Sequence, residues 1–427
     1  MAISTLTDYI CGKKIYENPK VELRKLYLGI SICTNLSILG FFKYYNFFIN
    51  SFYDLLISIG VKTENTWLLD IILPMGISFY TFQTMAYTID IYRNNTKPTN
   101  NLLSFALYVT YFPQLVAGPI ERAKRLLPQL EKPRSYCPKT VSSGIALIIT
   151  GFFKKVVIGD YLSAPYANLA FTETISCSPE ALMLGICMFS IQIYADFSGY
   201  SDIARGISRM LGIELMVNFR QPYLSRNITE FWKRWHISLS EWLRDYLYIP
   251  LGGNRNSNFK THRNLLITMI LGGLWHGANW TFVIWGALHG FYLIFHKLIL
   301  GKTKSDFSNM VTFNIFLKNT GKIFLMNILV LLTWIFFRAN NLEHSIDYIK
   351  NLTIGLLNLS ILIKLMVILI MYLGFIFGID YLFYKTDSDE ILSKSNFIIR
   401  IPVYTVLILS VWIAWPSEYS PFIYFQF

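Results

Sequence analysis

Residues 264–297 read NLLITMILGGLWHGANWTFVIWGALHGFYLIFHK, an apolar stretch that is interrupted by one polar break. The 12 residues from Asn264 to Trp275 would make about 18 Å of helix, whereas the hydrocarbon core of a membrane is about 30 Å thick. A helix that enters beside Arg263 would therefore place His276 near the middle of the membrane. Glycines on both sides of His276 allow a break, and broken backbone at that depth is tolerated only where it is buried in protein or lines a cavity. An ionisable side chain there is a functional candidate; the alternative is a histidine that is hydrogen-bonded inside a helix bundle.

The composition of the whole chain supports a membrane protein. Of the 427 residues, 53% are apolar and only 15% are charged, against about 25% charged residues in a soluble domain. These values exclude a disordered chain, a coiled coil and a secreted disulfide scaffold. The five cysteines form no CxxC pair, so neither a zinc site nor a redox dithiol is expected. The net charge of +12 needs no nucleic acid, because cytoplasmic loops of membrane proteins carry excess Lys and Arg.

Apolar runs divide the chain into candidate membrane segments at roughly 26–42, 67–89, 102–117, 141–163, 180–199, 264–274, 278–296, 320–337, 357–384 and 397–415. The first 23 residues contain no apolar run, so no signal peptide is expected. Loops 121–140 and 203–263 are basic, whereas loop 164–179 contains no Lys or Arg. The positive-inside rule places the two basic loops in the cytoplasm and the third outside. We therefore predict a single all-α polytopic membrane domain over residues 1–427.

A basic and aromatic stretch at 226–255, RNITEFWKRWHISLSEWLRDYLYIPLGGNR, is too polar to span a membrane. Its apolar residues recur at helical spacing, which predicts an amphipathic helix. Lys233, His236, Ser240 and Arg244 share another face of that helix. One interpretation is a helix that only anchors the protein at the membrane surface. The other is that Lys233, His236 and Arg244 bind an anionic cytosolic substrate.

Three polar residues in an apolar run, Gln192, Asp196 and Tyr200, lie on one helical face. They either line a polar substrate path or form a hydrogen-bond clamp between helices. Asn279, three residues after His276, is a further candidate for substrate binding. The chain contains no GxSxG, HExxH, GxxxxGK[ST] or GxGxxG motif, which argues against hydrolase, zinc protease, P-loop and dinucleotide-binding functions.

Several segments together resemble the bacterial membrane-bound O-acyltransferases of the alginate O-acetyltransferase type. They are LGFFKYYNFF at 39–48, LPMGISFYTFQTMAYTIDIYR at 73–93, YFPQLVAGPIER at 111–122, QIYADFSGYSDIARG at 192–206, FRQPYLSRNITEFWKRWHISLSEWLRDYLYIPLGGNR at 219–255, GGLWHGANWTFVIWGALHG at 272–290 and FIYFQF at 422–427. The resemblance implies a ring of tilted transmembrane helices, with re-entrant and interfacial helices, around a central funnel or tunnel. Family members usually carry further apolar segments before the point that matches Ser4–Ile15, so the N-terminus is expected to be short for the family.

The resemblance also implies an activity. His276 would be catalytic and His236 would be the second histidine of the site. An acetyl group would pass from cytosolic acetyl-CoA, a substrate rather than a bound cofactor, across the bacterial inner membrane to an extracytoplasmic glycan. A partner periplasmic or surface transferase often completes such a transfer.

The chemistry of histidine fits this activity, because a neutral imidazole can act as the general base for an acceptor hydroxyl. We assign that role to His276, whose water-poor surroundings would limit hydrolysis of the donor. His236 either orients the donor or takes part in a second proton transfer. We expect His276 to be reachable from both sides of the membrane, with Gln192, Asp196 and Tyr200 near the route. The alternatives are a transporter or flippase, which the lack of internal repeats disfavours, and a non-catalytic scaffold of a polysaccharide export complex.

Overall fold

The computed structural model describes residues 1–61, 67–255, 257–300, 313–356, 358–386, 396–416 and 422–423, and these contain helices and no strand. Five helices among the described residues are long and apolar enough to cross a membrane: Val21–Ser58, Pro138–Thr172, Pro179–Met210, Trp280–Ile299 and Asn319–Arg338. A sixth candidate is the pair Leu342–Gly355 and Leu359–Tyr372, which is bent by 114°. The predicted all-α polytopic membrane protein is thus confirmed, while the ring of helices and its central funnel stay predictions.

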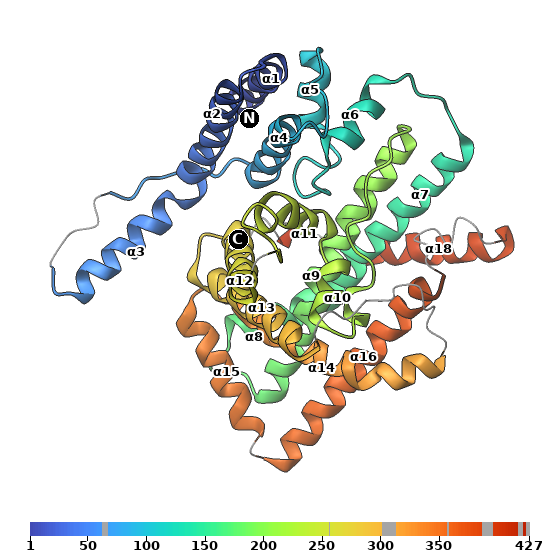
Figure 1. The fold of residues 1–427 in the computed structure, drawn as a ribbon. Coiled ribbons are helices and arrows are strands. Elements are labelled where there is room, and N and C mark those ends of the chain that lie inside the picture. Colours follow the sequence, from blue (N-terminus) through green and yellow to red (C-terminus); the bar gives the residue numbers. More distant parts are fainter. Residues whose placement is uncertain are drawn as a thin grey trace.

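The N-terminal part of the chain forms a group of helices at the top and left of Figure 1. It consists of α1 (Ala2–Glu17), α2 (Val21–Leu39), η1 (Gly40–Tyr44), α3 (Tyr45–Ser58), α4 (Ile77–Tyr92), α5 (Leu102–Thr110) and α6 (Ala123–Glu131). Helix α1 has no apolar run, and it docks through polar groups: Ser31 and Asn35 of α2 donate to the carboxylate of Asp8 at 2.6 and 2.7 Å. Such buried hydrogen bonds explain how a polar helix can pack inside this group.

Two predicted segments in this region are too long. Segment 67–89 becomes helical only at Ile77, because Pro74 and the left-handed Gly76 (φ 71°) precede the first turn. Segment 102–117 is helical only to Thr110, after which the chain turns.

Helix α9 (Pro179–Met210), 32 residues long, runs through the middle of the molecule. It begins after Ser178, whose hydroxyl caps the helix by accepting from the Ala181 N–H at 3.3 Å. It packs against the preceding elements α7 (Pro138–Phe152), η2 (Phe153–Ser163) and α8 (Ala164–Thr172). The central position of α9 explains why its apolar segment is the most buried of the five candidate spans.

The basic stretch does not form the single amphipathic helix that its periodicity predicts. After the short helix η3 (Pro222–Leu224), it divides into α10 (Ile228–Arg234), α11 (Ile237–Leu243) and η4 (Arg244–Tyr248). Between α10 and α11, Trp235 is extended (φ −96°, ψ 127°) and His236 is left-handed (φ 43°). The Ile237 N–H donates to the Asn218 carbonyl at 2.9 Å instead of to a helical partner. Tertiary contacts therefore outweigh the local helical pattern.

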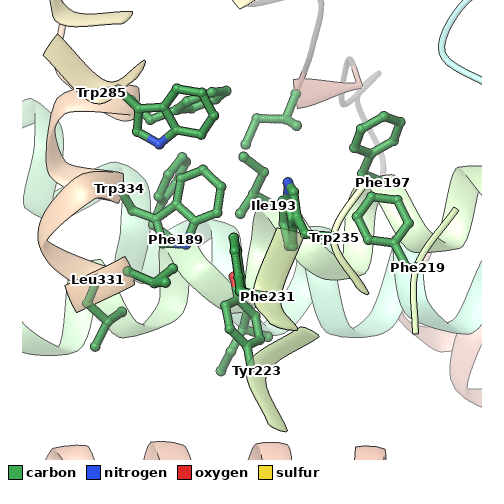
Figure 2. Packing of buried hydrophobic residues seen from close by; sticks show 14 of the residues in the cluster. Phe189, Ile193, Phe197, Phe219, Tyr223, Phe231, Trp235, Trp285, Leu331 and Trp334 are labelled. Atoms are coloured by element: carbon green, nitrogen blue, oxygen red, sulfur yellow. The ribbon is translucent and has the colours of Figure 1, made fainter. Parts of the chain in front are cut away.

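Packing of aromatic rings fixes this break. Figure 2 shows Trp235 in the middle of a buried cluster of apolar side chains. Its ring centroid lies 5.1 Å from that of Phe219, 5.1 Å from that of Trp334 and 5.6 Å from that of Phe231. These centroid separations are those of favourable aromatic pairs. The extended conformation of Trp235 is what turns its ring into the cluster.

The C-terminal part consists of α12 (Asn258–His276), α13 (Trp280–Leu300), α14 (Phe313–Arg338), α15 (Leu342–Leu356), α16 (Leu359–Thr386) and α18 (Phe397–Ile413). Helix α12 starts six residues before the predicted segment 264–274 and ends at His276. The predicted break at His276 is therefore confirmed. Helix α12 packs against α13, α13 packs against α14, and α14 contacts α9 near the centre of Figure 1.

Candidate functional site

His276 is the last residue of α12 and lies at the break between two helices. Gly277 is extended (φ −156°, ψ 149°), and the side chain of Asn279 accepts from the Thr281 N–H at 3.0 Å, so that α13 begins at Trp280. The amide of Asn279 also donates to the Asn340 carbonyl at 2.7 Å. The structure therefore gives Asn279 a capping role, and its role in substrate binding stays a prediction.

Aromatic rings surround the imidazole of His276, which is 5% exposed. Its ring centroid lies 5.1 Å from Trp275, 5.1 Å from Trp285 and 5.3 Å from Phe337. The rings of Trp275, Trp285 and Phe337 are apolar over most of their surface. Such surroundings keep water away from a reacting group.

The second predicted histidine lies beside the first. His236, at the left-handed position between α10 and α11, is fully buried, and its ring centroid is 6.4 Å from that of His276. The ring of Phe197 on α9 packs against His236 edge to face, at 4.6 Å. The fold thus brings together two histidines that are 40 positions apart in the sequence.

Asn218 orients His236, and sequence analysis missed it. The side-chain oxygen of Asn218 accepts from the Ser238 N–H at 3.1 Å and from the Ser238 hydroxyl at 2.9 Å. A backbone N–H can only donate, so the side-chain oxygen of Asn218, and not its NH2 group, must face the Ser238 N–H. The same oxygen lies 3.3 Å from Nδ1 of His236, which therefore carries the proton and leaves the lone pair on Nε2. Burial lowers the pKa of His236 to about 3, so the ring is neutral at physiological pH.

The structure divides the predicted face of Lys233, His236, Ser240 and Arg244, and its role in binding an anionic substrate stays a prediction. Lys233, Ser240 and Arg244 line a pocket of about 310 Å³, whereas the break at residue 236 turns His236 into the core. Leu265 and Met269 of α12 and Leu293 of α13 form apolar parts of the pocket wall. The Nε–H of Arg244 donates to Asp245 at 2.8 Å, and this hydrogen bond raises the pKa of Arg244. Glu241 also lines the pocket, so its wall combines two cations and one carboxylate with several apolar side chains.

The three polar residues of α9 have different surroundings. Asp196 forms an ion pair of 2.5 Å with Lys155 of η2, and its other oxygen accepts from the Ile423 N–H at 2.7 Å. This is the arrangement expected of a clamp between segments. The ring of Tyr200 packs on Phe422 at 5.2 Å, and Gln192 is buried. Their predicted place near a substrate route stays a prediction. In the part of the chain that the structure describes, no group of three or more His, Cys, Asp or Glu could hold a metal ion.

The chain is similar to known proteins of one family. Residues 98–337 match the model of the membrane-bound O-acyltransferase family. The chain is 39% identical to a probable alginate O-acetylase of Pseudomonas putida over 99% of its own length and 89% of that relative. It is 43% identical to a probable alginate O-acetylase of Azotobacter vinelandii over 80% of its length, and 36% identical to a peptidoglycan O-acetyltransferase of Helicobacter pylori over 84%.

The matches differ in how much of each relative they cover. The chain spans 66% of the Azotobacter protein, just under two thirds, and 70% of the Helicobacter protein. The family match covers more than half of the chain, including α9, both histidines and the break between α12 and α13. Together with the multi-pass helical structure, it shows that this chain belongs to the membrane-bound O-acyltransferase family.

Proposed function

We propose that this protein is an O-acetyltransferase of the bacterial inner membrane. It takes an acetyl group from cytosolic acetyl-CoA and passes it across the membrane for the O-acetylation of an extracytoplasmic polysaccharide. The observation that carries this proposal is the meeting of His276 and His236, 6.4 Å apart between ring centroids, at a break in the helices. The alginate and peptidoglycan O-acetylating relatives support a polysaccharide as the final acceptor.

The proposed reaction uses His276 as the general base. The oxygen of an acceptor hydroxyl attacks the carbonyl carbon of the thioester while the imidazole takes the hydroxyl proton. The carbon–sulfur bond then breaks, and the thiolate of coenzyme A leaves and takes up a proton. The products are an acetyl ester and a free thiol. His236, with its lone pair on Nε2, either orients the donor or serves as the second proton carrier.

The pocket beside α11 is the proposed donor site. Lys233 and Arg244 at its rim suit the phosphates of coenzyme A, since cations bind phosphates through charge-assisted hydrogen bonds. Met269 in its wall lies seven residues before His276 on the same helix, which corresponds to about 10 Å. The wall of the pocket at Met269 is thus about two helical turns from His276 along α12.

The acceptor side remains open to two routes. Either the hydroxyl of the polysaccharide takes the acetyl group directly, or a partner periplasmic or surface transferase relays it. Both routes need the same proton transfer at His276, so one substitution tests them together.

The test of the proposal replaces His276 by Ala. We expect ester-linked acetate on envelope glycans to disappear while the amount of protein in the membrane stays near normal. His262→Ala is the matched control, because it removes a histidine near the other end of α12. Full acetylation by the His276→Ala variant would contradict the mechanism and favour a scaffold.

A second test concerns the donor. The double variant Lys233→Glu, Arg244→Glu should raise the KM for acetyl-CoA by about tenfold or more, the effect of losing roughly 1.4 kcal/mol of binding. Its control is Arg255→Glu, Lys260→Glu, which makes the same change of charge in the same basic region but outside the pocket. An unchanged KM in the Lys233→Glu, Arg244→Glu variant would contradict the donor site and favour a region that only anchors the protein at the membrane surface.

A further inference from the structure

The C-terminal end of α12 poses a structural problem. The last carbonyl groups of any helix have no partner within that helix. A glycine in the left-handed conformation often solves this, but Gly277 is extended instead (φ −156°). Within a membrane, carbonyls without a partner cost several kcal/mol each. Some other group must therefore bind the carbonyls beside His276.

Two side chains from the distant N-terminal region bind these carbonyls. The Nζ of Lys43 donates to the carbonyl of Trp275 at 2.7 Å and to that of His276 at 3.0 Å. The hydroxyl of Tyr44 donates to the carbonyl of Leu274 at 2.9 Å. The third hydrogen bond of the Lys43 ammonium goes to the hydroxyl of Ser78 at 3.3 Å. Three consecutive carbonyls of α12 are thus bound by two consecutive residues.

Lys43 and Tyr44 reach this position because their own helix is also broken. They belong to the π-helical turn η1, which joins α2 to α3 within the candidate span Val21–Ser58. Turns of this type often occur at functional sites. The two breaks in the protein thus lie against each other, and the one at η1 supplies the donors for the one at His276.

A lysine is a costly way to cap a helix in an apolar span. Moving a cation into a membrane costs a few kcal/mol, whereas a glycine or asparagine cap would need no charge. The negative end of the α12 dipole offsets part of this cost. The remaining cost is explained if the ammonium does more than end a helix, because it binds the backbone of the proposed general base itself.

We propose that Lys43 is a positioning residue for His276. Its ammonium fixes the end of α12 and thereby holds the imidazole of His276 against His236. The inference rests on the proposed function, and it assigns Lys43 no contact with the reacting atoms. A shift of about 1 Å in a catalytic group can reduce the rate about 100-fold. The loss of Lys43 should therefore act on kcat more than on substrate binding.

The experiment compares Lys43→Met, Lys43→Arg and Tyr44→Phe with the wild type, all as full chains purified in lipid nanodiscs. Acetyl transfer from acetyl-CoA is measured per folded protein, with folding checked by thermal unfolding. We expect Lys43→Met to lower kcat about 10- to 100-fold with a KM within threefold of the wild type. Lys43→Arg, which keeps a cationic donor, should recover part of the loss. Lys364→Met, which removes an exposed lysine paired with Glu180 on the surface, should leave kcat unchanged.

Each outcome decides one question. A wild-type protein without transferase activity refutes the proposed function and not the contacts of Lys43. An active wild type with Lys43→Met within threefold of its kcat, or with KM raised in step with the loss, overturns the positioning role. If Lys43→Met does not fold, Lys43→Arg decides, because it keeps a cation but changes its reach to the carbonyls of Trp275 and His276. A lowered kcat with a KM within threefold of the wild type supports the inference, and an unchanged kcat overturns it. Tyr44→Phe, which removes only the bond to Leu274, serves as the comparison.

Discussion

Helices α7 and α9 approach each other through paired glycines, and this contact predicts the effect of adding single methyl groups. A Cβ atom on Gly199 would lie 2.7 Å from the Gly151 carbonyl oxygen, and one on Gly206 would lie 2.5 Å from the Gly144 carbonyl oxygen. Ordinary contacts of this kind begin near 3.4 Å, so Gly199→Ala requires the helices to separate by about 0.7 Å. Small residues are the usual means of close helix packing in membranes.

The magnitude follows from this separation. Overpacking of this extent costs about 1–3 kcal/mol. We expect Gly199→Ala to lower the free energy of unfolding by about 2 kcal/mol. The double variant with Gly206→Ala should lose more, but less than twice as much, because one separation of the two helices relieves both contacts. With the unfolding entropy typical per residue, the thermal midpoint should fall by roughly 2 °C in the single variant and by roughly 2–4 °C in the double variant. Activity should fall as well, because Phe197 of α9 packs against His236 and would move with the helix.

The assay is thermal unfolding in nanodiscs, followed by circular dichroism, with acetyl transfer measured on the same samples. Gly321→Ala on α14 is the matched control, because a Cβ there meets nothing within 4 Å. We expect that variant to keep the wild-type midpoint. An unchanged midpoint in the Gly199 and Gly206 double variant, or an equal loss in the control, would refute the reasoning.

Three further predictions concern buried polar groups. Asn218→Leu leaves three donors of Ser238 and His236 without an acceptor and should cost about 2–4 kcal/mol of stability, whereas Asn218→Asp keeps the acceptor. Asp196→Ala leaves the ammonium of Lys155 without one of its carboxylates and should cost about 3 kcal/mol. Burial raises the pKa of Glu121 from 4.5 to about 7, so the folded protein keeps a proton that the unfolded chain releases. Stability should therefore fall by roughly 2 kcal/mol as the pH rises from about 5 to 7, and Glu121→Gln should remove that slope.

All three are measured by chemical unfolding, the last one across a pH series. The exposed pair Lys14–Glu17, at 3.5 Å, provides the control for the ion pair, and Lys14→Ala should cause no measurable loss. Equal losses in Lys14→Ala and Asp196→Ala would contradict the second prediction. Equal losses in Asn218→Leu and Asn218→Asp would contradict the first, and a slope that persists in Glu121→Gln would contradict the third.

Sequence patterns located the break at His276 but not the one at His236. The first depends on a local property, since glycines flank the histidine and the apolar run before it is short. The second lies within a regular helical pattern, and only the ring of Trp235 in the aromatic cluster and the Ile237 N–H on Asn218 produce it. Hydrophobic periodicity predicts which face of a helix a residue occupies. It does not show which distant group will form a hydrogen bond with the backbone in place of the helical partner.

The sequence by itself determined that the chain is a helical membrane protein, because composition and the length of apolar runs decide whether a segment can leave water. It also identified both histidines as candidates. Only the tertiary structure decided that His236 faces His276, that Asn218 sets its tautomer, and that Lys43 caps α12 from 233 positions away. These contacts join polar groups from separate segments. In an environment without water each such group must find a partner inside the protein, and which partner it finds depends on how the helices pack.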